Sequence, residues 1–190
     1  MSKKLLAIAL GTAATIGVAH AAPPTFYVGG DIAGLTSKID DKSGIPPSVS
    51  GHAHAATLRL RGGAHILDWL DAELHFVMPR DTRYSVTLGV ENKVKSSIFG
   101  AFAKPNINVG PVNLYGLVGF AQSKMEFSGV LLGSETESGV AYGAGVQYPF
   151  TKNLAGLIDY VRYLKKSDFG GAGIDVTNSA ISAGIVYTFK

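Results

Sequence analysis

The sequence predicts an all-β protein, an eight-stranded antiparallel transmembrane β-barrel. One observation is the alternation in residues 182–189, where Ala, Ile, Tyr and Phe occupy the odd-numbered positions and mostly small or polar residues occupy the even-numbered ones. A second is the scarcity of charge, because charged residues are 16% of this chain and about 25% of a typical soluble domain. A third is that no stretch after residue 22 approaches the ~20 apolar residues of a spanning helix. The apolar residues therefore belong to short strands.

Alternation with a period of two marks eight candidate strands. They cover residues 25–36, 54–67, 71–79, 94–104, 112–126, 138–149, 153–165 and 177–189. Residues 22–190 provide about 21 residues for each strand and its connection, which suits tilted spans of about 10 residues. Closing the strands into a barrel satisfies every backbone donor and acceptor, as lipid demands.

One face of each strand is apolar, and we expect it to contact lipid. It carries the even-numbered residues of the first seven strands, including Val94, Ile98, Gly100 and Phe102, and the odd-numbered residues of the last. A soluble sandwich would carry many more charges on its exposed faces. The opposite face holds charges among small residues and is expected to line a narrow, filled lumen. Its members are Asp31, Arg59, Arg61, His65, Glu73, His75, Lys95, Tyr115, Gly143, Gly145, Gln147, Asp159 and Ser182.

The last strand carries a further pattern, formed by Ser182, Gly184, Tyr187 and Phe189. This spacing matches the terminal sorting signal of bacterial outer-membrane barrels, although such chains usually end at the Phe and this one adds Lys190. The chain resembles the small outer-membrane barrels of the opacity and outer-membrane-protein-A-like superfamily. The resemblance implies a place in the outer membrane of a Gram-negative bacterium, in contact with lipid and lipopolysaccharide. It also implies assembly by the barrel assembly machinery and periplasmic chaperones.

The amino terminus agrees with export. Lys3 and Lys4 precede an apolar run that ends before Ala19-His20-Ala21, the pattern of a cleavable signal peptide. We predict a signal peptide at residues 1–21 and a barrel domain at 22–190. The chain has no cysteine, which excludes disulfides, thiolate metal sites and a cysteine nucleophile.

The connections are expected to alternate in length, with short turns facing the periplasm and long loops facing outward. Short turns are predicted at residues 68–71, 105–108 and 149–153, and long loops at 37–53, 80–93, 127–137 and 166–176. Aromatic girdles are predicted at both rims. The inner girdle comprises Phe26, Tyr27, Trp69, Phe102, Tyr148, Phe150, Tyr187 and Phe189, and the outer one Phe120, Phe127, Tyr160, Tyr163 and Phe169.

The charged lumen residues predict a network that closes the interior. Arginine pairs with carboxylates through two parallel hydrogen bonds where water is scarce, and unpaired buried charges are costly. The candidates are Asp31, Arg59, Arg61, Glu73 and Asp159. The alternative is an ion-permeable gate in which the pairs exchange partners.

Two histidines share the predicted inward face, and His65 is expected opposite either Glu73 or His75. With a carboxylate they could bind a metal or titrate near pH 6, but their spacing has no specific signature. We interpret them as lumen residues. His52 and His54 are interpreted as incidental surface histidines, and no metal or cofactor is predicted.

Arg162 breaks the facing rule, because its even number would place it in lipid. Either a β-bulge near Val161 turns it inward, or it lies above the hydrocarbon, where the cost of a charge falls to ~0–1 kcal/mol. In the second case Arg162, Lys165 and Lys166 could contact lipopolysaccharide phosphates.

The leading functional hypothesis is an outer-membrane structural or adhesin-like surface-interaction protein whose loops meet a host or matrix ligand. The alternative is a narrow porin-like channel for ions or very small solutes. A lipid-A-modifying enzyme is a third hypothesis, but no motif brings a nucleophile, a histidine and an acid together, so no catalytic residue is assigned. Nucleic-acid binding has no support, because removing Lys3 and Lys4 from the 17 basic residues leaves 15 against 14 acidic ones.

Overall fold

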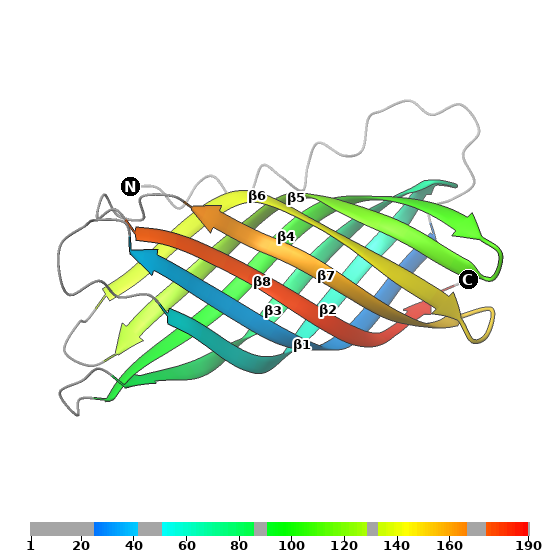
Figure 1. Ribbon diagram of the computed structural model, residues 1–190. Helices are drawn as coiled ribbons and strands as arrows, with labels where there is room; N and C mark the ends of the chain where they lie inside the picture. Colours follow the sequence, from blue (N-terminus) through cyan, green and yellow to red (C-terminus); the bar gives the residue numbers. More distant parts are fainter. Residues whose placement is uncertain (1–24, 42–50, 86–90, 129–132, 167–173, 190) are drawn as a thin grey trace.

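The structure, a computed structural model, describes residues 25–41, 51–85, 91–128, 133–166 and 174–189, which form a closed barrel of eight strands (Figure 1). Each strand pairs antiparallel with its neighbour in sequence, and β1 also pairs with β8. The strands are β1 Thr25–Asp41, β2 Gly51–Leu67, β3 Leu70–Ser85, β4 Glu91–Val109, β5 Val112–Ser128, β6 Gly133–Pro149, β7 Leu154–Lys166 and β8 Ile174–Thr188. The predicted fold is confirmed. No helix in the described ranges is long and apolar enough to cross a membrane. Residues 1–24 lie outside these ranges, so the signal peptide stays a prediction.

The barrel has two different ends. Tight turns join β2 to β3, β4 to β5 and β6 to β7 at one end, where β8 also finishes (Figure 1). We call this the turn end, and the opposite end the loop end. Strands reach further toward the loop end than predicted: β1 runs to Asp41 and β3 to Ser85. The predicted loops are therefore shorter, and their centres at 42–50, 86–90, 129–132 and 167–173 lie outside the described residues.

The second turn differs from the prediction. Residues 105–108 lie within β4, and the turn is made by Gly110 and Pro111. Gly110 has a φ of 61°, a left-handed conformation that glycine adopts at little cost. The asparagines that suggested a turn instead cross-link the hairpin, because Asn113 Nδ2 donates to Asn106 Oδ1 at 3.1 Å and to Asn108 Oδ1 at 2.8 Å.

The outer wall is apolar, as predicted for seven of the strands. Ile32, Leu60, Phe120, Ile158 and Ile185 expose between 46% and 70% of their surface. The fourth strand is the exception. Its even-numbered residues face the lumen rather than lipid, because Ile98 and Phe102 are buried while Phe99 is half exposed.

The aromatic residues divide between wall and lumen. Most of the predicted inner girdle faces outward at the turn end, and Tyr187 and Phe189 pack edge to face with ring centroids 5.2 Å apart. Tyr27, Phe102 and Tyr163 are instead buried in the lumen, so their assignment to girdles was wrong. Of the outer girdle, Phe120 and Tyr160 face outward. Phe169 and the side chain of Phe127 lie outside the described part.

Candidate functional site

A network of charged side chains crosses the lumen in the half nearer the turn end. Seven polar lumen residues were predicted from the sequence, and the structure brings all of them together except His65. Lys104, which was not predicted, completes the network, which we call the plug. Its residues are Asp31 of β1, Arg59 and Arg61 of β2, Glu73 and His75 of β3, Lys104 of β4 and Asp159 of β7, and all are buried.

Arg59 connects β2 to β1 and to the far wall of the barrel. Its Nε donates to Asp31 Oδ2 at 2.7 Å, and its Nη2 donates to both oxygens of Asp159 at 2.8 and 2.9 Å. The remaining Nη1 donates to the Tyr163 hydroxyl at 2.9 Å. Every nitrogen of this buried guanidinium therefore has an acceptor.

Arg61 lies beside Arg59 and is shared by three carboxylates. Nη2 donates to Asp31 Oδ2 at 2.9 Å and to Asp159 Oδ2 at 2.7 Å, while Nη1 donates to Glu73 Oε1 at 3.0 Å. Because like charges repel, two adjacent guanidiniums are stable here only through the carboxylates between them.

Glu73 gathers the other side of the plug. Its Oε2 accepts from the Tyr27 hydroxyl at 2.6 Å and from Lys104 Nζ at 2.9 Å. Its Oε1 lies 2.6 Å from His75 Nε2. The Lys104 ammonium is also 4.4 Å from the centre of the Tyr115 ring, a cation–π distance.

The seven residues of the plug are balanced in charge, and one further buried carboxylate, Asp71, lies 3.9 Å from Lys104 Nζ. Three cations face three carboxylates, and each cation lies within 3.0 Å of at least one of them. A buried charge left without its partner costs about 3–5 kcal/mol. Each charged member of the plug therefore depends on its partners, although the buried Asp31 Oδ1 has no hydrogen-bond partner among the described residues.

Glycines provide the room for the plug. A Cβ at Gly63 would collide with the Tyr27 ring, and one at Gly145 would collide with the Tyr115 ring. Both tyrosines need this space, because the Tyr27 hydroxyl reaches Glu73 and the Tyr115 hydroxyl donates to Asp159 at 3.0 Å. The small residues on the inward face are therefore positioning elements.

The carboxyl-terminal pattern takes part in the plug. The Ser182 hydroxyl donates to Asp159 Oδ1, and a Cβ at Gly184 would collide with Asp31. Tyr187 and Phe189 point to the outer wall. The pattern therefore has an inner half that completes the lumen and an outer half that faces the membrane.

Apolar layers lie on both sides of the plug. Toward the turn end, Tyr27, Leu157 and Val186 form one buried cluster. Toward the loop end, a larger cluster follows the plug residues along their strands. It contains Ala33, Leu35, Val77, Ile98, Phe102, Leu117, Ala121, Ala141, Val161, Tyr163 and Ala180, together with Tyr115, which lies beside the plug. The lumen is thus an ionic layer between two mainly apolar layers, with buried Asp71 on the turn-end side and buried Thr57, Ser123 and Asn178 on the loop-end side.

His65 does not join His75, contrary to one sequence hypothesis. A one-residue bulge at Ile66 sets the register so that His65 lies opposite Asp71, not opposite Glu73 or His75. His65 Nδ1 is 2.7 Å from Asp71 Oδ1 at the mouth of the turn end. No group of three or more metal-ligating side chains occurs among the residues that the structure describes.

Arg162 faces outward, so the hypothesis that a bulge turns it inward was wrong. The bulge lies one residue later, between Arg162 and Leu164, and buries both Tyr163 and Leu164 in the lumen. Lys165 is exposed, and the side chain of Lys166 lies outside the described part. The side chain of Lys95 also lies outside the described part, although its backbone belongs to β4.

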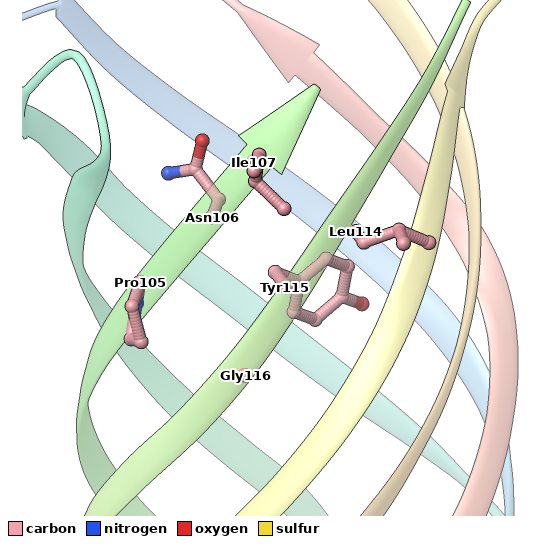
Figure 2. A pocket seen from close by; sticks show the side chains of 6 residues that line it. All are labelled: Pro105, Asn106, Ile107, Leu114, Tyr115 and Gly116. Atoms are coloured by element: carbon pink, nitrogen blue, oxygen red, sulfur yellow. The ribbon is translucent and has the colours of Figure 1, made fainter. Parts of the chain in front are cut away.

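The outer wall also has a shallow hollow near the turn end (Figure 2). It lies between β4 and β5, where the register has no pair for Pro105 and Gly116. Proline has no backbone N–H to donate across the gap. Its lining is Pro105, Asn106, Ile107, Leu114, Tyr115 and Gly116, and it presents no cluster of titratable groups.

Comparison with solved structures shows the same fold in bacterial outer-membrane proteins. Neisserial surface protein A is 19% identical with a TM-score of 0.59, over 86% of this chain and 97% of its own. OprG of Pseudomonas aeruginosa is 14% identical with a TM-score of 0.58, over 87% and 96%. Ail, the attachment invasion locus protein of Yersinia pestis, solved with the heparin analogue sucrose octasulfate, is 18% identical with a TM-score of 0.51, over 87% and 100%. No curated protein sequence matches the chain.

The family model described as the outer membrane protein beta-barrel domain matches residues 5–189, nearly the whole chain. The apolar outer wall, the closed eight-stranded sheet and this match agree on a location in the outer membrane of a Gram-negative bacterium. The chain belongs to the outer membrane protein beta-barrel domain family.

Proposed function

We propose that this protein is a closed outer-membrane barrel with a structural and adhesin-like role, which presents its loop end to partners outside the cell. The observation that supports this most is the layered lumen, with a charge-balanced plug between two apolar clusters. A solute crossing it would have to separate buried ion pairs, at about 3–5 kcal/mol for each charge left alone, and then pass packed apolar side chains.

The loop end is the natural recognition surface. A strand needs about 9–11 residues to span the bilayer, whereas β1, β2 and β5 have 17 each. The additional residues extend the barrel wall beyond the lipid and lift the loops away from it. Loops on a rigid scaffold are where binding residues concentrate.

A sulfated glycan of the host surface or matrix is the ligand class to test first. Ail was solved with a heparin analogue, and its barrel has the fold of this one. Here Lys38 and Lys124 are exposed on the parts of β1 and β5 near the loop end. Such cations match the sulfate groups of a glycan by charge complementarity.

The test is a series of deletions in residues 42–50, 86–90, 129–132 and 167–173, scored for binding to heparin, matrix proteins, serum proteins and cells. We expect at least one deletion to abolish binding of one ligand while leaving the barrel folded. If every deletion bound all ligands as well as the intact protein does, the surface role would be wrong.

A narrow ion channel is the second candidate. The plug favours it in one respect, because Arg61 contacts three carboxylates and could exchange them without being left unpaired. Single-channel recording in planar bilayers separates the two functions. No reproducible openings are expected from the closed barrel, and steady unit conductance would establish the channel.

We propose no catalytic role. On the outer wall, the described residues bring a hydroxyl and a histidine together at Thr36 and His54, where Oγ1 and Nδ1 are 3.1 Å apart. A nucleophile of this kind also needs an orienting acid, and neither residue has a hydrogen bond to a carboxylate of the described segments. Analysis of lipid A from cells that overproduce the protein is expected to show no change, and a modified lipid A would contradict this.

We also propose that the barrel assembly machinery recognises Tyr187 and Phe189, which face outward at the end of β8. Replacing both with serine is expected to lower the amount of assembled barrel in the outer membrane. Replacing Trp69, an exposed aromatic residue of the first turn, is the matched control.

A further inference from the structure

We propose that Arg162 and Lys165 form a binding site for the phosphate groups of lipopolysaccharide, on the outer wall near the loop end. This site is separate from the surface-binding role proposed above, because it concerns the wall of the barrel rather than its loops. Lys166 was part of the sequence hypothesis, but the proposal rests on the two residues whose side chains the structure describes.

The outward-facing side chains of β7 change from apolar to charged toward the loop end. Ile158 is 58% exposed, Tyr160 is 40% exposed, and Arg162 and Lys165 follow toward the loop end. With about 3.3 Å per residue and a strand tilt of about 40°, Arg162 lies roughly 20 Å above Leu154. The apolar band of such barrels is about 25 Å tall, and a long side chain extends its charge to the interface. The guanidinium therefore reaches the level of the outer headgroups.

The bulge in β7 keeps the two cations on the same side of the wall. Without it, strict alternation would send Tyr163 and Lys165 inward and Leu164 outward. The register shift after Arg162 buries both Tyr163 and Leu164, so Lys165 returns to the outside. The next outward position after Arg162 is thus also a cation.

Neighbouring aromatic residues hold Arg162 in place. Tyr142 of β6 lies directly opposite Arg162, whose Nη1 donates to the Tyr142 hydroxyl at 2.6 Å. The guanidinium carbon lies 5.4 Å from the centre of the same ring, and Tyr160 is the preceding outward residue of β7. An arginine held in one orientation loses less conformational entropy when it binds a ligand.

The positive charge of this site is not neutralised by the described part of the protein. Arg162 and Lys165 form no salt bridge there, unlike the three plug cations. The Arg162 Nε is itself buried and has no hydrogen-bond partner there, so a ligand would be met by the terminal Nη atoms. The residue opposite Arg162 on β8 is Ser179, which is uncharged. An arginine without a carboxylate partner at the headgroup level suits a phosphate, because the planar guanidinium can donate two parallel hydrogen bonds to the phosphate oxygens. Lipopolysaccharide is the phosphate-bearing lipid that the outer leaflet presents at this height.

The test is a titration of the folded full-length barrel in detergent with EDTA, using lipopolysaccharide and enzymatically dephosphorylated lipopolysaccharide. The variants are Arg162→Gln, Lys165→Gln and the double variant. The matched control is Lys152→Gln, which removes an exposed lysine from the turn end. A cation near a membrane surface contributes about a fivefold change in affinity, so we expect about fivefold weaker binding for each single variant and about 25-fold for the double variant. Lys152→Gln should bind like the original protein.

Three results would overturn the proposal. One is an unchanged Kd in the double variant. Another is equal binding of phosphorylated and dephosphorylated lipopolysaccharide. The third is competition by inorganic phosphate at concentrations similar to those of the glycolipid phosphate, which would assign the site to a soluble anion. Lys165→Gln changes an exposed side chain and keeps the test valid if Arg162→Gln lowers the yield of folded protein.

Discussion

The two halves of the lumen are closed in different ways. In the turn-end half, Arg59, Arg61 and Lys104 are fixed by hydrogen bonds to carboxylates. In the loop-end half, apolar side chains such as Val77 and Leu117 fill the space. The ionic half fixes one arrangement, because each donor has a defined acceptor, whereas the apolar half depends on volume alone. The lumen is therefore closed both by ion pairs and by apolar packing, and the contribution of each to stability can be tested separately.

The largest expected effect is on the ionic half. Replacing Arg61 with alanine leaves Asp31, Glu73 and Asp159 with fewer cations than carboxylates, in a buried site. We expect the free energy of unfolding to fall by about 3–5 kcal/mol, measured by reversible urea unfolding in lipid vesicles. Lys152→Ala, on the exposed third turn, should change it by no more than about 0.5 kcal/mol. A loss below about 1 kcal/mol for Arg61→Ala would mean that the plug is not a buried ionic unit.

The apolar half should respond through cavity formation. Leu117→Ala is expected to cost about 2–5 kcal/mol, because the lost side chain leaves a void in the lumen. Leu114→Ala on the same strand is the matched control, since Leu114 faces outward and lipid can fill the space. The Leu117 variant should be the less stable of the two by at least about 1 kcal/mol in the same unfolding experiment. Equal losses would show that the loop-end half is not tightly packed.

Tyr163 joins the two halves, and its hydroxyl should have an intermediate effect. It accepts from Arg59 Nη1 at 2.9 Å and lies 3.1 Å from His75 Nδ1, while its ring belongs to the apolar cluster. Tyr163→Phe keeps the ring and leaves these groups without one partner. We expect a loss of about 1–3 kcal/mol in the free energy of unfolding. Tyr148→Phe at the exposed rim should leave the free energy of unfolding unchanged. If Tyr163→Phe also left it unchanged, the Tyr163 hydroxyl would not couple the two halves.

Ser182 should have the smallest effect. Asp159 also accepts from Arg59, Arg61 and Tyr115, so Ser182→Ala removes one hydrogen bond of several. A loss of about 0.5–1.5 kcal/mol is expected in the same assay. Because Thr188 is also on the inward face of β8 but has no bond to the plug carboxylates, Thr188→Ala serves as the control. A loss as large as that of Arg61→Ala would place Ser182 at the centre of the plug.

The sequence predicted the fold and most of the plug because both follow from alternation. Five plug residues stand at inward positions of strands whose other face is apolar, so their charge and their odd-numbered positions both predict that they face the lumen. These residues are Asp31, Arg59, Arg61, Glu73 and Asp159. Their partners could not be assigned, because pairing across the lumen depends on strand register and tilt.

The error on β4 has a physical cause. The facing rule equated apolar residues with lipid, and the lumen beside Ile98 and Phe102 is itself apolar. Both faces of β4 are therefore apolar there, and periodicity cannot separate them. One signal was present, because Lys104 shares the parity of Ile98 and Phe102 and would have been placed in lipid with them. The charge of Lys104 was the better guide.

Bulges account for the remaining differences. A single extra residue at Ile66 places His65 opposite Asp71, and another after Arg162 keeps Lys165 outside. Neither position contains a glycine or proline that would mark it. A one-residue shift reverses every later side chain on its strand, so local register errors have large effects on site assignment.

The role of the last strand in the plug limits how the protein can be re-engineered. A chimera that carried the final strand of another barrel could keep an acceptable aromatic ending, yet any side chain larger than hydrogen at position 184 would meet Asp31. The outward aromatic residues of the sorting signal and the inward residues that complete the plug would then have to be exchanged together. Transplanting the segment would succeed only with matching changes on β1 and β7, which makes this terminus specific to its own barrel.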